Sequence, residues 1–339
     1  MPARYTRALA PAFARQLASE GLKWIAGLHR AGLGKEPWAL DPQFRERNTF
    51  SLYHGTTRLL DVKFKKGNGE ELVFWAAQAY GDAGTPSASA YASLMKAWPI
   101  KEAAGLEVLC REYLAKAIDT ADVSKYQNRK EGYWQNRLAL SYGGNWDLKR
   151  DWLIFDREVV LGFANEEEAT KAFAPVREKY EKVVKDLQAA DPARFGSADL
   201  RIGNEVDLLA LGPANELICI ELKHGTNAAG VYWGPVQASA YRELLEPVLP
   251  QVLEGIQRLV QQKVALGLLP PAALLWVPEE KLSGVQAVLA VAEPNPRSDC
   301  WKSLELVQER LGAAKVSVVS LTQTEGGVAK EALGPKGKD

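Results

Sequence analysis

Cysteine is scarce in this sequence: it occurs three times in 339 residues, at positions 110, 219 and 300. No two of these cysteines form a CxxC pair, which argues against a zinc ribbon or a cysteine-ligated iron–sulfur cluster. A sparse, odd set of cysteines is typical of a reducing compartment. Cys219 lies within an apolar stretch, where we expect a small buried hydrophobic residue.

Long hydrophobic runs are also missing. No segment approaches the 18 or so uninterrupted apolar residues that a membrane span requires. The start of the chain, MPARYTRALAPAFARQLASEG, lacks the unbroken apolar core of a signal peptide and is typical of an amphipathic helix. We therefore expect a cytoplasmic protein without a membrane segment.

The chain has no net charge, because Lys+Arg and Asp+Glu each number 42. This balance gives no overall basic signature of nucleic-acid binding. The segment from Met1 to Lys66 is nevertheless basic, with 12 Lys+Arg against 5 Asp+Glu. Two explanations stay open for this excess: a solvated face, or a phosphate-binding surface. The second would include Arg45, Arg47, Lys63, Lys65 and Lys66.

What the chain does contain is enough apolar residues for a large core, with 47% hydrophobic residues and 10 Trp. Over residues 1–160 we expect an α+β region that recognises a substrate or partner. It has a helix to about residue 29, alternating strands at 59–64 and 71–76, and helices at 89–98 and 101–119. Residues 82–90 are expected to be a flexible connection.

Helix and strand alternate from about residue 165, starting with a helix that we expect Pro175 to bend or break. Strands are predicted at 272–278, 284–294 and 315–323. The pattern predicts an α/β domain over 161–330, with a mixed central sheet flanked by helices, and a flexible tail at 331–339.

One stretch of this region, GNEVDLLALGPANELICIELKHG at 203–225, carries charges in two otherwise apolar strands. Burying a charge is costly unless the charge is paired or binds a metal. A three-residue loop would pair Leu211 with Leu217 and Leu209 with Cys219. The same register places Asp207 opposite Glu221, two carboxylates that repel each other unless a cation or a proton lies between them.

Strand alternation puts Lys223 on the same face as Glu221 and turns Leu222 the other way. A divalent cation such as Mg²⁺ takes oxygen ligands, and the lysine could hold a water or stabilise charge on a phosphoryl group. The simpler alternative is structural: Glu205 pairs with Lys223 across the strands, and Asp207 caps a turn. In the helix that follows, Gln237 and Tyr241 are one turn apart and share a face.

Asp207, the triplet Glu221-Leu222-Lys223 and the later Gln237-xxx-Tyr241 together resemble the PD-(D/E)XK nuclease superfamily. The order is most similar to the branch with a QxxxY motif, found in helicase-associated, lambda-exonuclease-like and CRISPR-associated nucleases. The resemblance covers roughly 165–245 and does not extend to the region 1–160. It implies a restriction-endonuclease-like core.

The resemblance also implies a role for each matching residue. Asp207, Glu221 and the backbone carbonyl of Leu222 would be metal ligands. Lys223 would orient or activate the attacking water. Gln237 would contact the metal-bound water, the lysine or the phosphate, and Tyr241 would contact nucleic acid.

Glu205 precedes Asp207 by two residues and would be a further polar, substrate-binding member of the site. The sequence departs from the family where Val206 replaces the usual proline. Some relatives add a helical acid, for which Glu178 and Glu181 are candidates, but their apolar stripe points away from such a role, and we leave both out. His224 is expected to be a polar residue at a strand end.

The resemblance thus implies a deoxyribonuclease that depends on Mg²⁺ or Mn²⁺ and acts in repair, restriction or phage defence. DNA is the expected substrate, RNA stays open, and the N-terminal region could bind a protein partner. The alternative is a non-catalytic module that keeps the nuclease fold to bind nucleic acid or a protein. Both acids and the lysine are present, which favours an enzyme.

Overall fold

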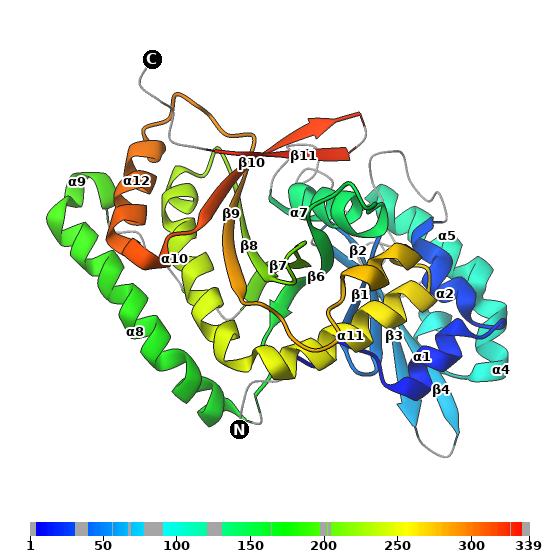
Figure 1. Ribbon diagram of the computed structural model, residues 1–339. Helices are drawn as coiled ribbons and strands as arrows, with labels where there is room; N and C mark the ends of the chain where they lie inside the picture. Colours follow the sequence, from blue (N-terminus) through cyan, green and yellow to red (C-terminus); the bar gives the residue numbers. More distant parts are fainter. Residues whose placement is uncertain are drawn as a thin grey trace.

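The computed structural model describes residues 5–30, 40–55, 57–66, 69–77, 91–120, 131–163, 165–196, 202, 205–325 and 327–333. Within this part the chain forms two sheets with helices around them (Figure 1). The expected flexible connection at 82–90 and the tail residues 334–339 lie outside it. No helix in the described residues combines the length and apolar character needed to cross a membrane.

The first sheet is an antiparallel meander of five strands in the order β1-β2-β3-β4-β5, which confirms the expected strands at 59–64 and 71–76. Alternation gives it one apolar face, where Phe13 stacks on Phe64 and Trp24 stacks on Phe74. Its strands are β1 (Asp41–Glu46), β2 (Thr49–His54), β3 (Thr57–Lys66), β4 (Glu70–Ala76) and β5 (Ala97–Pro99).

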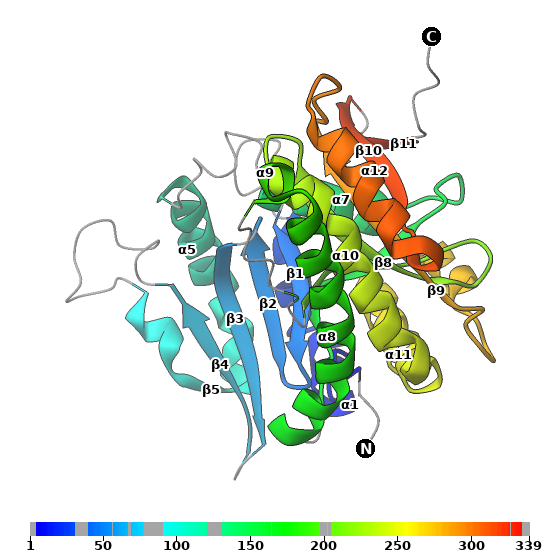
Figure 2. The same ribbon diagram turned by 90° about the vertical axis from the view of Figure 1, so that its left-hand side faces the viewer.

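Short helices accompany this sheet, and α5 lies beside it in Figure 2. The helix expected at 89–98 is wrong: this part of the chain holds a 3₁₀ turn and then β5, in which Trp98 pairs with Leu72. Pro99 at the end of β5 cannot continue a helix. The helical elements are α1 (Pro11–Ala18), α2 (Lys23–Gly27), η1 (Leu28–Arg30), η2 (Ala92–Met95), α4 (Ile100–Ala103), η3 (Ala104–Leu106) and α5 (Glu107–Thr120).

The second sheet has six strands in the order β11-β10-β9-β8-β7-β6 and is mixed, as expected. Strands β6, β7 and β8 are antiparallel, β8, β9 and β10 are parallel, and β11 returns antiparallel to β10. The strands are β6 (Leu153–Val160), β7 (Glu205–Leu211), β8 (Leu217–His224), β9 (Val285–Ala292), β10 (Ser317–Thr324) and β11 (Gly327–Ala332).

Strand β11 was not foreseen and takes up the first residues of the expected tail. The strand expected at 272–278 is also wrong, since η6 (Pro271–Trp276) is a 3₁₀ helix that begins directly after Pro270.

Helices cover both faces of this sheet (Figure 1). Helix α10 packs on β8 and β9, with α12 and α8 beyond it, and α7 lies on the opposite face. Helix α8 runs through Pro175 without a break, and its first turn is capped by Asn165, which accepts a hydrogen bond from the Glu168 amide at 2.9 Å. The elements are α7 (Glu131–Ala139), η4 (Leu140–Gly144), α8 (Glu166–Ala190), α9 (Pro192–Phe195), α10 (Ala228–Leu245), η5 (Glu246–Val248), α11 (Leu249–Ala265), α12 (Cys300–Leu311) and η7 (Gly312–Ala314).

The expected boundary at residue 160 falls directly after β6, which pairs with β7 in the second sheet. Helix α7, also before the boundary, packs on the same sheet. One continuous hydrophobic core extends from Tyr5 to Val316. The N-terminal region therefore contributes directly to the sheet that holds the candidate site.

Candidate active site

The β7–β8 hairpin has the predicted register. Leu211 pairs with Leu217 and Leu209 pairs with Cys219. The Gly212 amide donates to the carbonyl of Glu216 at 3.0 Å, which leaves the predicted three-residue loop at 213–215. Asn215 adopts φ 61°, the left-handed conformation that commonly closes such loops.

Strands β7 and β8 stop pairing just where the charged residues begin. The ladder ends at Leu208 and Ile220. Beyond it the Asp207 side chain takes the place of a backbone partner, and its Oδ2 accepts the Leu222 amide at 2.8 Å. Because the N–H and C=O of one strand residue point to the same edge, the Leu222 carbonyl also points toward β7.

Glu221 and Lys223 lie next to each other on β8, as their spacing predicts. Lys223 Nζ is 2.5 Å from Glu221 Oε1. The Glu221 residue is only 2% exposed, and within the described part of the chain its second oxygen, Oε2, has no hydrogen-bond partner. The structural alternative, an ion pair of Lys223 with Glu205, does not form: Glu205 is exposed and pairs in register with Val160 of β6.

Helix α7 adds two residues that the sequence analysis missed. Glu131 Oε1 lies 3.8 Å from Lys223 Nζ, and Gln135 Nε2 donates to Asp207 Oδ1 at 3.2 Å. Their i, i+4 spacing, which puts both on one helical face, was the available signal. It went unused because no helix was predicted at 131–139. Asp207, Glu221, Glu131 and Lys223 form one group, the acid cluster.

Glu178 and Glu181, the two helical acids left out of the prediction, do not belong to the acid cluster. Both are on α8, where Glu178 is exposed. Glu181 lies 4.0 Å from Lys185, one turn further along the helix. The additional helical acid near Lys223 therefore comes from a different helix, α7.

Three carboxylates and one lysine make the acid cluster strongly electronegative. Burial, followed by the charge of Glu221, raises the pKa of Asp207 well above its ordinary value, although Lys223 and the Leu222 amide oppose the change. Burial also raises the pKa of Glu221 and of Glu131. A bound cation would relieve the same repulsion that these raised pKa values express.

Lys223 stays protonated in this surrounding. Burial alone lowers the pKa of a lysine, but the charges of Glu221, Asp207 and Glu131 outweigh burial and raise it. The ammonium can thus donate hydrogen bonds and stabilise negative charge, but it cannot accept a proton.

Tyr241 and Gln237 lie on α10. Tyr241 is only 4% exposed, and burial, together with the charges of Glu221 and Asp207, raises the pKa of its hydroxyl. Its ring is covered by protein, so the hydroxyl is the part of Tyr241 suited to a polar contact. Gln237, one turn earlier, is half-buried.

His224 ends β8 as a polar strand-end residue. Its Nδ1 lies 2.8 Å from the Thr226 hydroxyl, and its Nε2 lies 3.4 Å from Glu293 Oε2. These contacts hold the turn between β8 and α10 in place.

The basic residues of the N-terminal region divide into two kinds. Arg45 is structural: it forms an ion pair with Glu158 and stacks over Tyr53. Lys65 and Lys66 stand directly opposite Glu71 and Glu70 on β4, as cross-strand pairs of opposite charge do. Arg47 and Lys63 are exposed, and both remain suited to phosphate contacts.

No family model matches the chain, and no curated protein or solved structure compared with it matches either. Among the described residues, no group of three or more His, Cys, Asp and Glu side chains is arranged to hold a metal ion. The carboxylates near Lys223 are those of Glu221, Asp207 and Glu131.

Proposed function

We propose that the chain is a metal-dependent nuclease of the PD-(D/E)XK type that hydrolyses DNA phosphodiester bonds. The observation that supports it most is the pair of half-buried Asp207 and buried Glu221, at the point where β7 and β8 separate, with protonated Lys223 beside them. In a sheet with no binding role, placing two acids and a lysine in the protein interior would lower stability without any compensating benefit.

The arrangement around this point supports a restriction-endonuclease-like core. In chain order, α7 is followed by β6, by the helices α8 and α9, by β7 and β8, by the helices α10 and α11, and by β9. Strands β6, β7 and β8 are antiparallel, and β9 lies parallel to β8. The acids lie on the two central strands of this unit, and α7 and α10 cover opposite faces (Figure 1).

The residues present fit a divalent cation with oxygen ligands. Glu221 Oε2 is buried without a hydrogen-bond partner among the described residues, so one lone-pair site is available. Asp207 and the Leu222 carbonyl would complete the protein's share, and Mg²⁺ commonly keeps several waters besides one or two carboxylates. When bound, such an ion would stabilise negative charge on the phosphoryl oxygens.

The remaining residues of the site would position the metal ligands, the attacking water and the phosphate. Lys223, as a charged donor, would hold the attacking water or a phosphate oxygen in line with the scissile bond. Gln135 fixes the orientation of Asp207 by its hydrogen bond to Oδ1. Gln237 and the Tyr241 hydroxyl would contact water or phosphate from α10, and exposed Glu205 would lie at the rim of the site.

A cleavage assay tests this function. The purified chain should cut DNA in the presence of Mg²⁺ or Mn²⁺ and should not cut it in EDTA. Linear, circular and single-stranded DNA, with RNA in parallel, would show the substrate and whether the chain cuts from ends or internally. Pathways of repair, restriction and phage defence would each use such an activity.

Variants separate this activity from contamination and from a binding role. Lys223→Ala and Asp207→Ala should each abolish metal-dependent cleavage. Glu178→Ala, which removes an exposed acid on α8, should cut like the wild type. A wild-type protein that binds DNA without cutting it under any of these conditions would instead support the non-catalytic module.

A further inference from the structure

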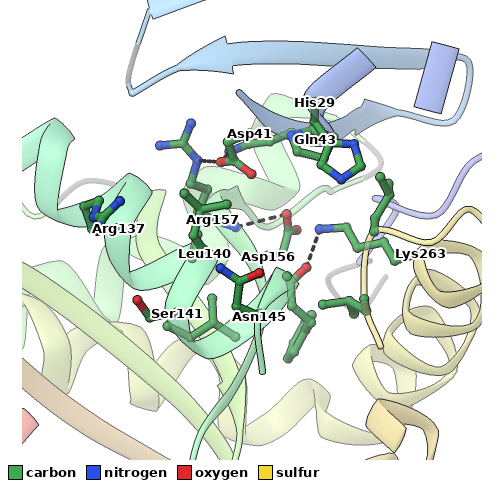
Figure 3. A pocket seen from close by; sticks show the side chains of 18 of the residues that line it. His29, Asp41, Gln43, Arg137, Leu140, Ser141, Asn145, Asp156, Arg157 and Lys263 are labelled. Carbon is green, nitrogen blue, oxygen red and sulfur yellow. Dashed lines mark hydrogen bonds and ion pairs between the residues drawn. The ribbon is translucent and has the colours of Figure 1, made fainter. Parts of the chain in front are cut away.

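A cavity of about 580 Å³ is lined by residues from both sheets, on β1 and β6, and by none from α10. Figure 3 shows it from close by. One wall comes from β1 and from β6 near Asp156 and Arg157, and the other from α7, η4 and the chain after α11. The volume falls within the usual range of about 300–1,000 Å³ for small-molecule sites. None of the residues proposed for the nuclease site lines it.

Cations outnumber acids by one among the residues that line this cavity. Arg157 forms an ion pair with Asp41, and Arg7 Nε lies 3.2 Å from Asp156 Oδ2. Lys263 Nζ donates to the carbonyl of Phe155 at 2.5 Å. Arg7 itself lies outside the lining. The charged residues that line the cavity are four cations, Arg30, Arg137, Arg157 and Lys263, and three acids, Asp41, Asp156 and Glu325. An anion inside the cavity would compensate this excess.

Two buried polar groups that line the cavity are incompletely satisfied. Within the described part of the chain, Arg157 Nη1 and Gln43 Oε1 have no hydrogen-bond partner, although the two residues are 2% and 1% exposed. Leaving such groups unpaired in the protein interior is costly. Arg157 needs an acceptor and Gln43 Oε1 needs a donor, so a fitting ligand offers both.

We propose that this cavity binds a nucleoside monophosphate. The phosphate would accept hydrogen bonds from Arg157 and Lys263, because a guanidinium fork and an ammonium together suit a phosphate group. A hydroxyl or amino group of the nucleoside would donate to Gln43 Oε1. The apolar side chains of Leu140, Leu268 and Leu269 would cover the base.

Isothermal titration calorimetry on the full chain in EDTA tests this site. The titrants are a set of nucleoside 5′-monophosphates, the parent nucleosides and inorganic phosphate. We expect a monophosphate to bind at least about tenfold more tightly than its nucleoside and than inorganic phosphate, since it uses both kinds of contact. Absence of monophosphate binding overturns the proposal, as does equal affinity for a nucleoside or for inorganic phosphate.

Two variant pairs locate the binding. Asn145→Trp would fill the exposed edge of the cavity without removing a buried charge and should abolish binding. Leu148→Trp, on the same segment but outside the lining, should bind like the wild type.

Lys263→Met should weaken binding about tenfold, against an exposed control, Lys302→Met. If Lys263→Met does not fold, Asn145→Trp decides alone. Wild-type affinity in Asn145→Trp would place the binding elsewhere and refute the cavity site. Because binding is measured without metal and without cleavage, failure here leaves the nuclease proposal untouched.

Discussion

Replacing Asp207 by asparagine should stabilise the metal-free protein. The change keeps the shape of the side chain and removes one negative charge from the acid cluster. The oxygen of the new side-chain amide can still accept a hydrogen bond from the Leu222 amide. Its nitrogen can donate to Gln135 Oε1, which is buried without a hydrogen-bond partner in the described part of the chain, once the Gln135 amide turns over.

The size of this gain in stability follows from the charge of Asp207, which its surroundings in the wild type compensate only in part. A buried polar group without full compensation costs about 1–3 kcal/mol, and more if charged. Asp207 is partly open to solvent and is also attracted by Lys223, so we take about 1.5 kcal/mol. With an unfolding entropy of about 2.1 cal/mol/K per residue, 339 residues give about 0.7 kcal/mol/K. The melting temperature should therefore rise by about 2 °C.

The gain should depend on pH with a definite sign. Below the ordinary aspartate pKa of about 3.9, Asp207 carries a proton in both the folded and the unfolded chain, and its charge costs nothing. As pH rises toward the raised pKa of folded Asp207, the unfolded chain ionises first and the folded wild type loses stability. The difference between Asp207→Asn and the wild type should therefore be larger at pH 8 than at pH 5.

Thermal denaturation followed by circular dichroism in EDTA measures both effects. Glu205→Gln serves as the control, because it removes an exposed carboxylate two residues earlier on the same strand. It should shift the melting temperature by less than about 0.5 °C. A destabilised Asp207→Asn at pH 8, or a gain that grows as pH falls, would refute the account of an uncompensated acid cluster.

Three further outcomes follow from the same contacts. Lys223→Met should lose cleavage. Because it leaves the three acids without their cation, it should also lower the free energy of unfolding in urea by roughly 3 kcal/mol at pH 8, and by less at pH 5. Lys223→Arg should keep most of that stability. Gln135→Leu should fold but raise the Mg²⁺ concentration for half-maximal cleavage at least about tenfold, as loss of a group orienting a metal ligand does. Removing Arg47 and Lys63 together should lower the salt dependence of DNA binding, measured by fluorescence anisotropy. Arg45→Ala should lower the melting temperature instead. An unchanged salt slope in the double variant would mean that the basic excess of residues 1–66 is a solvated face.

The hairpin that carries Asp207 and Glu221 could be predicted from sequence because its determinants are local. A three-residue loop fixes the register of two adjacent strands, and the period of two fixes which residues share a face. Cys219 and Leu209 therefore appear opposite each other as expected. The same reasoning could not foresee that β7 leaves β8 beyond Leu208, since that depends on what packs around the strand ends.

Elements set by distant contacts were predicted poorly. Trp98 lies in a short strand because it adds to the edge of the first sheet beside Leu72, and no local signal announces such pairing. Strand β11 likewise exists by pairing with β10. Glu131 and Gln135 belong to the same category, because their approach to β7 and β8 is visible only after α7 has packed on the sheet.

Through helix α7, the N-terminal region takes part in holding the acid cluster together. A C-terminal nuclease domain starting at residue 161 would lack α7 and β6, and with them the hydrogen bond from Gln135 to Asp207 and the edge pairing of β7. Asp207 would keep its bond to Leu222 but lose the donor that orients its other oxygen. If Asp207 holds a metal ion as proposed, it must be held within about 0.5 Å of its working position, and the first half of the chain then helps to build the site.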